Sequence, residues 1–468
     1  MTRAPLRRAL LRLTCAAAVL GAAAGFPAPA NAVSPPRIDP GALDAAVALS
    51  GRPAPLEPTE QRELCAEPVL RGSPPSEPPM SQRVLDLPAA WQFSRGAGQK
   101  VAVIDTGVNR HPRLPALQAG GDYVSDSDGT VDCDGHGTLV AGIIAARPSP
   151  DDAFVGVAPE AEILTIRQLS LAYDTKDRQP DRSGELRNDG YGSVLTLAAA
   201  VVRAVDMGAT VINISEVACT AAGSDTADAS LGAAVKYAYD RNVVVVAAAG
   251  NVEQGGPCQN QNEGSGWSSV STIPSPAWFT PYVLAVGSVD ADGKPSALSL
   301  RGPWLGAAAI GRNIVSLDSK PGGTGLVDGV QTMDGVQPVD GTSFAAPYVA
   351  GLAALVRARF PELSAQQVID RITRTAHAPG RGRDDAIGAG LIDPLAALTA
   401  PLADEAPSRG ADVGHPIPTP YAAPEPDPRP RRIAIAGSLT LLAALGIGAA
   451  FGFPFRRRRA DLNQEFEE

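Results

Sequence analysis

Short apolar runs alternate with longer, alanine-rich amphipathic runs between residues 98 and 400. The short runs are rich in β-branched residues and predict strands, whereas the longer runs predict helices. Strands that alternate with helices indicate βαβ units, so we expect an α/β fold with a parallel sheet and helices on both faces. The predicted strands are Lys100–Ile104, Ala161–Arg167, Val211–Ser215, Val243–Ala248 and Tyr282–Val289. The predicted helices are Gly137–Ala145, Val194–Met207, Ser230–Arg241 and Ser343–Phe360.

A further apolar run lies near each end of the chain. Residues 1–32 combine a basic start, an apolar centre and small residues before position 33, which is the pattern of a secretory signal peptide. Cys15 leaves a lipoprotein alternative open, although the apolar run continues beyond it. Residues 433–455 carry no charge over a length that spans a bilayer, so they predict one C-terminal transmembrane helix. Arg456–Arg459 follow directly and favour a cytoplasmic tail over 456–468, with the preceding domain outside the cell membrane.

The remaining segments are separated by their proline content. Residues 33–80 are rich in proline and have helical potential only over Gly41–Leu49, so we expect an N-terminal extension that lies over the surface of the following domain. Residues 81–400 form that domain. Residues 401–432 repeat proline without a periodic apolar pattern, which predicts an extended linker.

Composition and charge limit the class of partner. The 468 residues suffice for one large domain with appendages. The formal net charge is −10, so nothing in the overall balance attracts nucleic acid, and we expect no nucleic-acid partner. Two clusters of arginines, Arg3–Arg12 and Arg456–Arg459, border the terminal apolar runs, where they indicate topology.

Four cysteines remain after the predicted signal peptide: Cys65, Cys133, Cys219 and Cys258. An even number in an exported chain favours two disulfides, for which three pairings are possible. A zinc site is the alternative, but no CxxC spacing or histidine cluster accompanies these cysteines.

An acidic segment between residues 122 and 134 offers clustered carboxylates for calcium, although such segments are usually solvated. No full calcium-loop pattern is present, so the sequence predicts neither a metal nor a cofactor. The acidic residues are Asp122, Asp126, Asp128, Asp132 and Asp134.

Three short motifs carry candidate chemistry. The motif VAVIDTGV puts Asp105 at the end of a buried strand, DGHGTLVAGIIAA puts His136 at the start of a helix, and GTSFAAPYVAGLAAL puts Ser343 at the start of another. A serine hydroxyl becomes a nucleophile when an imidazole takes its proton and a carboxylate fixes that imidazole. Each residue alone also suits a turn or a helix cap. Their joint occurrence, each with neighbouring glycines, predicts a catalytic triad.

The order Asp, His, Ser and the three motifs resemble those of the subtilisin-like (peptidase S8) proteases. The resemblance implies a subtilisin-like sheet and a serine endopeptidase acting on proteins or peptides. It implies that Asn251, at the end of VVVVAAAGN, donates to the oxyanion, and that Ser215, Glu216 and Val217 pair with an extended substrate. It also favours pairing Cys65 with Cys133 and Cys219 with Cys258. We expect His111, His377 and His415 to be ordinary solvated residues.

The whole layout is similar to that of the mycosins, the subtilisin-like proteases of actinobacterial type VII secretion systems. The segments that carry this resemblance are the signal peptide, the proline-rich extension with Cys65, the contexts GVNRHPRL and DCDGHGT, the linker and the anchor. The resemblance implies an extension that is retained and a type VII secretion membrane complex as partner. Insertions over Leu169–Tyr191 and Gly255–Ile273 are candidate contact loops or plain surface decoration.

The sequence is also compatible with two alternatives to a secretion-linked protease. One is a structural component of the secretion complex whose protease activity is dispensable or occluded. The other is a degradative subtilisin that happens to be tethered, which the anchor and the short extension disfavour.

Overall fold

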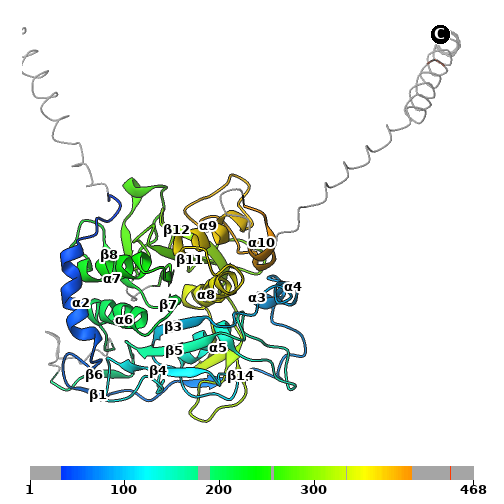
Figure 1. Cartoon of the computed structure of the whole chain (residues 1–468). Helices are drawn as coiled ribbons and strands as arrows, with labels where there is room; N and C mark the ends of the chain where they lie inside the picture. Colours follow the sequence, from blue (N-terminus) through cyan, green and yellow to red (C-terminus); the bar gives the residue numbers. More distant parts are fainter. Residues whose placement is uncertain (1–32, 178–189, 254–257, 334, 403–442, 444–468) are drawn as a thin grey trace, which may run out of the picture. The chain divides into compact units, whose positions relative to one another are not determined.

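A central sheet of seven strands, all paired in parallel, organises the chain, in the order β12-β11-β9-β7-β3-β5-β4. The computed structural model describes residues 33–177, 190–253, 258–333, 335–402 and 443 (Figure 1). The α/β class and the parallel sheet predicted from the sequence are confirmed. The strands, in chain order, are β3 Lys100–Asp105, β4 Leu117–Asp122, β5 Glu162–Arg167, β7 Val211–Ile214, β9 Val244–Ala248, β11 Val283–Val289 and β12 Leu305–Ile310.

Helices cover both faces of this sheet (Figure 1). Alternate residues of β3 show why: Val101 and Val103 belong to one apolar core, whereas Ala102 and Ile104 belong to the other. The first core includes helices α5 His136–Ala145, α8 Thr342–Arg359 and α9 Ala365–Thr375. The second includes α2 Leu43–Ser50, α6 Val194–Asp206 and α7 Ala229–Asp240. Strands buried on both faces read as continuous apolar runs, which is why the sequence revealed them.

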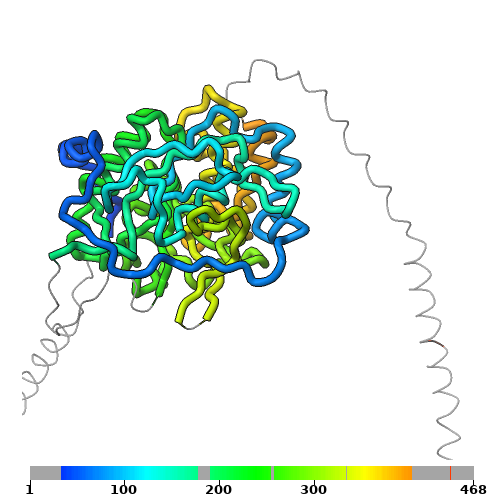
Figure 2. The backbone as a smooth tube through the Cα atoms, turned by 90° about the horizontal axis from the view of Figure 1, so that it is seen from below, coloured from blue at the N-terminus to red at the C-terminus, as the bar shows by residue number. Residues whose placement is uncertain are grey.

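The N-terminal extension runs along the outside of this body, as the dark blue segment of Figure 2 shows. The 3₁₀ helix η1 Pro40–Ala42 leads into α2, which packs on α6 and α7. Farther along, β1 Thr59–Gln61 pairs with β6 Tyr173–Thr175. Then β2 Glu67–Val69 pairs with β15 Gly329–Thr332. The extension is therefore held by strand pairing at two places.

Short elements complete the described part of the chain. Two short helices, α3 Met80–Arg83 and α4 Leu87–Ala90, lie at the end of the extension and directly after it. The C-terminal half of the chain contains the 3₁₀ helix η2 Trp267–Ser269 and the helix α10 Pro394–Thr399. The remaining strand pairs are β8 Ala218–Ala221 with β10 Thr272–Ser275, β13 Ser316–Leu317 with β14 Leu326–Val327, and β15 with β16 Gly335–Pro338.

Two disulfides join segments of the described chain. Cys65 of the extension is bonded to Cys133, and Cys219 at the start of β8 is bonded to Cys258. The first disulfide closes a separation of 68 residues and the second one of 39, so each restricts the unfolded chain.

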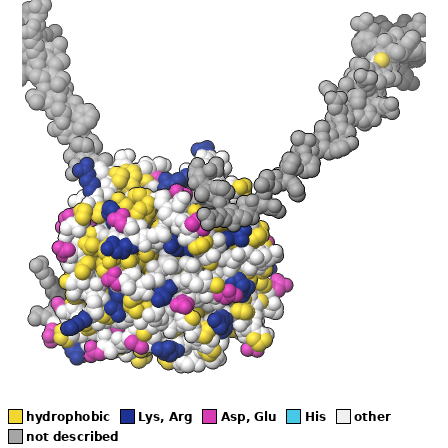
Figure 3. Space-filling view, in the orientation of Figure 1, with side chains coloured by type: hydrophobic (Ala, Val, Ile, Leu, Met, Phe, Trp, Pro, Cys, Tyr) yellow, Lys and Arg dark blue, Asp and Glu magenta, His cyan; other side chains and the backbone are white. Residues whose placement is uncertain are grey.

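The predicted signal peptide, linker, cytoplasmic tail and His415 lie outside the described residues, as does the predicted transmembrane helix apart from residue 443. Among the helices that are described, none has the combination of length and apolarity that crossing a bilayer requires. Figure 3 shows acidic and basic side chains interspersed on one face, without a basic stripe of the kind that binds nucleic acid.

Candidate active site

Asp105 ends β3 and is fully buried at the carboxyl edge of the sheet. Its Oδ1 accepts a hydrogen bond from the backbone N–H of Thr106 at 2.7 Å and lies 2.7 Å from His136 Nδ1. The Asp105–His136 contact places the proton of the neutral imidazole on Nδ1. His136 Nε2 is thereby left as the basic nitrogen of the ring.

His136 is the first residue of α5, and the backbone at both sides of it requires glycine. Gly135 has φ 76°, in the left-handed region that other residues avoid. A Cβ at Gly137 would lie 2.0 Å from the carbonyl oxygen of Gly107. The imidazole also packs on the ring of Phe344, with 4.8 Å between ring centroids. The flanking glycines of the motif thus let the histidine helix approach the loop after β3.

Asp132 positions the start of that helix. Its carboxylate accepts from Thr106 Oγ1, Gly135 N, Thr138 N and Thr138 Oγ1 at 2.6 to 2.8 Å. Burial raises the pKa of Asp132 to about 6 despite these hydrogen bonds. Asp122 is buried in the same way and accepts from Val124 N and Ser125 N. The expectation that this acidic segment is merely solvated is therefore wrong for these two residues, because each carboxylate satisfies buried backbone donors.

Ser343 is the second residue of α8 and lies at the edge of the cleft, 7% exposed. A Cβ at Gly341 would come within 2.9 Å of Ser343 Oγ and 3.1 Å of Asn251 Nδ2, so both polar atoms face the space beside this glycine. Asn251 Oδ1 accepts from Thr342 N at 2.9 Å and from Thr342 Oγ1 at 3.0 Å. These two hydrogen bonds fix the orientation of the Asn251 side-chain amide. Its Nδ2 therefore faces Ser343 and is free to donate.

A cavity of about 560 Å³ contains His136, Ser343 and Asn251 in its lining. Asp105 is not part of this lining but contacts it through the hydrogen bond to His136. Ser215, Glu216 and Val217, which follow β7, line the cavity as well, so the structure brings the residues predicted for catalysis, oxyanion binding and substrate pairing together at one cleft. No hydrogen bond joins Ser343 Oγ to His136 within the described residues; such contacts in enzymes without substrate often form only in the complex.

Sequence patterns did not reveal several other residues of this lining. Most come from the extension, from the loop after β5 and from the loops near β9 and α8, where no local motif marks them, and Asp134, which the sequence marked only as an acidic residue, lies just before α5. These residues are Glu63, Leu64, Ala66, Asp134, Leu169, Leu171, Ala172, Glu253 and Asp340.

The charge of the cleft is negative. Five carboxylate side chains line it, and no lysine or arginine is among its described lining residues. Glu216 Oε1 lies 3.7 Å from His136 Nδ1, the nitrogen that also faces Asp105. Burial lowers the pKa of His136, but Asp105, Glu216 and Asp132 outweigh burial and raise it to about 10. Burial raises the pKa of Glu216 to about 8, and His136 opposes that rise.

Asp105, His136 and Glu216 are also the one group of described residues whose donor atoms lie close enough to one another, within 4.8 Å, to hold a metal ion. However, Asp105 Oδ1 and His136 Nδ1 are already hydrogen-bonded to each other at 2.7 Å. That pairing suits an imidazole held for proton transfer better than two ligands of one ion.

Two other predicted features have different outcomes. His111 is buried, which contradicts the expectation of a solvated residue: its Nδ1 accepts from Arg113 N at 3.1 Å, and burial lowers its pKa. His377 is largely exposed and pairs with Asp393 at 3.2 Å.

The parallel sheet and the Asp–His–Ser cluster at its carboxyl edge define the class of subtilisin-like serine proteases. The subtilase family model agrees, matching residues 96–390. Mycosin-4 of Mycobacterium tuberculosis is 48% identical over 395 residues, which cover 83% of this chain and 84% of that protein. Mycosin-1 of the same organism is 48% identical over 79% of this chain and 83% of that protein. The chain therefore belongs to the subtilase family and, within it, to the mycosins, and it is a serine protease.

Solved structures of mycosins are also similar to this chain. The crystal structure of MycP1 from Mycobacterium smegmatis is 43% identical, with a TM-score of 0.72, and covers 82% of this chain and 99% of that one. A chain in the structure of an intact ESX-5 inner membrane complex is 42% identical, with a TM-score of 0.72, and covers 90% of this chain and 100% of that one.

Replacing Glu216 by glutamine is expected to move the acid limb of the kcat/KM profile to lower pH by about one unit. The carboxylate stabilises the protonated imidazole, so its removal makes the basic form of His136 available at lower pH. The measurement is kcat/KM for a fluorogenic peptide over a pH range that extends above 10, because the pKa of His136 is raised to about 10.

Glu253→Gln is the matched control, because Glu253 lines the same cleft but is not among the groups that shift the pKa of His136. A uniform fall in kcat/KM with an unchanged acid limb would show that Glu216 acts on substrate binding alone.

Proposed function

We propose that Ser343, His136 and Asp105 perform peptide-bond cleavage by acyl transfer. Ser343 Oγ attacks the scissile carbonyl while His136 Nε2 takes its proton, and Asp105 holds the ring and stabilises the imidazolium. His136 then gives that proton to the leaving amine, and water hydrolyses the acyl-enzyme by the reverse roles. The observation that carries this proposal is the 2.7 Å contact of Asp105 with His136 in a cleft that also contains Ser343.

Two donors serve the oxyanion in this proposal. Asn251 Nδ2 is oriented by the bonds from Thr342 to its Oδ1. The backbone N–H of Ser343 lies in the first turn of α8, where an N–H has no intrahelical acceptor. Ser215–Val217 borders the cleft between β7 and β8 and supplies backbone groups to an extended substrate.

The domain organisation and location belong to the same proposal. The signal peptide of residues 1–32 directs export, the extension of residues 33–80 is retained on the catalytic domain of residues 81–400, and the helix of residues 433–455 anchors the protein in the cell membrane. The linker of residues 401–432 holds the domain outside and the tail of residues 456–468 is cytoplasmic. The similarity to a chain of the ESX-5 inner membrane complex supports a type VII secretion complex as partner.

A structural role in that complex is the second candidate function, supported by the same similarity. Complementation of a deletion strain with Ser343→Ala separates the two roles. If proteolysis is the function, processing of an exported substrate stops while the complex still assembles. If secretion and processing both continue at wild-type levels, the protease proposal is wrong and the structural one stands.

A further inference from the structure

Two leucines are exposed at the rim of the cleft. Leu64 of the extension is 92% exposed and Leu171 of the loop after β5 is 60% exposed, yet both line the cavity that contains His136 and Ser343. Exposed leucines that share one concave site offer apolar surface to a ligand, whereas isolated ones need no explanation.

Leu64 lies between two anchored points of the extension. On one side, Arg62 N and Glu63 N both donate to the carbonyl oxygen of Ala172, at 2.8 and 3.1 Å. On the other side, the disulfide joins Cys65 to Cys133, and Ala66 N donates to the carbonyl oxygen of Cys133 at 2.8 Å. Cys133 is three residues before His136, so the extension is fixed to the segment that carries the catalytic imidazole.

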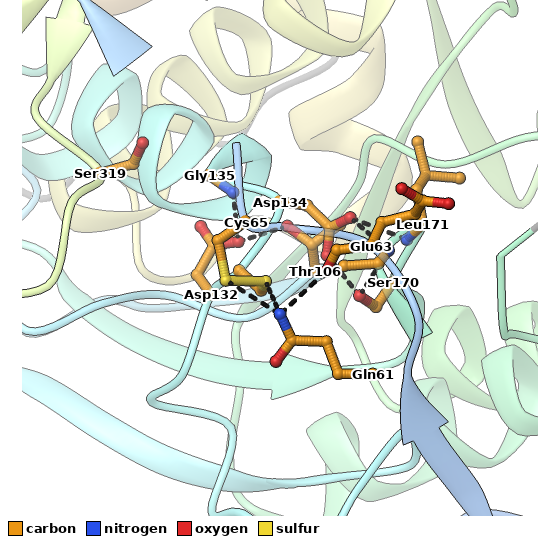
Figure 4. The surroundings of a disulfide bond; sticks show 12 residues. Gln61, Glu63, Cys65, Thr106, Asp132, Asp134, Gly135, Ser170, Leu171 and Ser319 are labelled. Atoms are coloured by element: carbon orange, nitrogen blue, oxygen red, sulfur yellow. Dashed lines mark hydrogen bonds between the residues drawn. A yellow bond between two sulfur atoms is a disulfide. The ribbon is translucent and has the colours of Figure 1, made fainter. Parts of the chain in front are cut away.

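Hydrogen bonds to Asp134 hold the backbone at Leu171 in place. The Asp134 carboxylate accepts from Ser170 Oγ at 2.5 Å, from Leu171 N at 2.7 Å and from Ala172 N at 3.2 Å. Figure 4 shows Glu63, Cys65, Asp134 and Leu171 grouped around the disulfide. Both leucines therefore stand on backbone that is already held in place, which lowers the entropy cost of binding.

We propose that Leu64 and Leu171 form a substrate subsite whose outer wall is supplied by the N-terminal extension, and that it takes an apolar side chain close to the scissile bond. This inference rests on the proposed protease function. The occupant is a peptide substrate, because the leucines continue the cleft that holds the triad. The carboxylate of Glu63 next to Leu64 disfavours an acidic side chain at the same place.

Leu64→Ser in the full-length protein tests the subsite. The probe is a library of internally quenched peptides in which one position at a time is leucine or serine. Wild-type protein is expected to prefer leucine at one position by about tenfold in kcat/KM, and Leu64→Ser is expected to lose most of that preference. The preferences at the other positions are expected to remain.

Leu56→Ser is the matched control, since Leu56 is an exposed leucine of the same extension that does not line the cleft. An unchanged preference in Leu64→Ser, or an equal loss in Leu56→Ser, overturns the subsite while leaving the protease function intact. Wild-type protein that neither cleaves peptides nor reacts with the fluorophosphonate overturns the proposed function and the subsite with it.

Discussion

Replacing His136 by alanine is expected to lower the turnover of peptide substrates at least about 1000-fold. Without the imidazole, the Ser343 hydroxyl has no base in reach and the leaving amine has no acid. Asp105 Oδ1 also loses its contact with the imidazole at 2.7 Å, so the buried carboxylate keeps only its hydrogen bonds from Thr106. The measurement is kcat for a fluorogenic peptide, normalised to the concentration of folded protein.

His377→Ala serves as the control, since His377 is an exposed histidine outside the cleft. Its turnover is expected to match that of the wild type. Near wild-type turnover in a folded His136→Ala protein would contradict the assignment of the base.

Replacing Asn251 by alanine is expected to lower kcat about 100- to 1000-fold with little change in KM, the range that the removal of an equivalent amide donor from subtilisin established. The effect falls on kcat because the oxyanion exists in the transition state and not in the bound substrate.

Asn251→Asp separates the donor from the scaffold. Aspartate retains an oxygen for Thr342 N and Thr342 Oγ1 but has no N–H for the oxyanion. A loss of kcat in Asn251→Asp as large as that in Asn251→Ala identifies Nδ2 as the donor. Wild-type kcat in Asn251→Asp would show that Asn251 only holds the loop before α8.

The sequence predicted the central strands that are buried on both faces. β3, β7 and β9 consist largely of valine and isoleucine, and their observed bounds differ from the prediction by one residue at most. The outermost strands escaped prediction. β4 has the sequence LQAGGD and β12 the sequence LGAAAI, both poor in β-branched residues, so their pairing with β5 and β11 depends on tertiary context.

The three residues of the proposed triad could be picked out from the sequence because three local motifs carry them, each with the glycines that close backbone approach demands. The contribution of the N-terminal extension to the cleft could not be predicted from the sequence. Glu63 bonds to Ala172, and Cys65 and Ala66 bond to Cys133, so this stretch is held at the cleft by partners about a hundred and about seventy residues away along the chain. Likewise, the resemblance assigned Glu216 only to substrate pairing, whereas its contact with His136 depends on the positions of β7 and α5.

Labelling of the full-length protein with a fluorophosphonate tests the central claim most directly, because the probe reacts only with a serine that an assembled site activates. The wild type is expected to be labelled, and the labelling is expected to disappear in Ser343→Ala, which removes the reacting oxygen. A folded wild-type protein that is not labelled, or labelling that persists in Ser343→Ala, would contradict the assignment of Ser343 as the nucleophile.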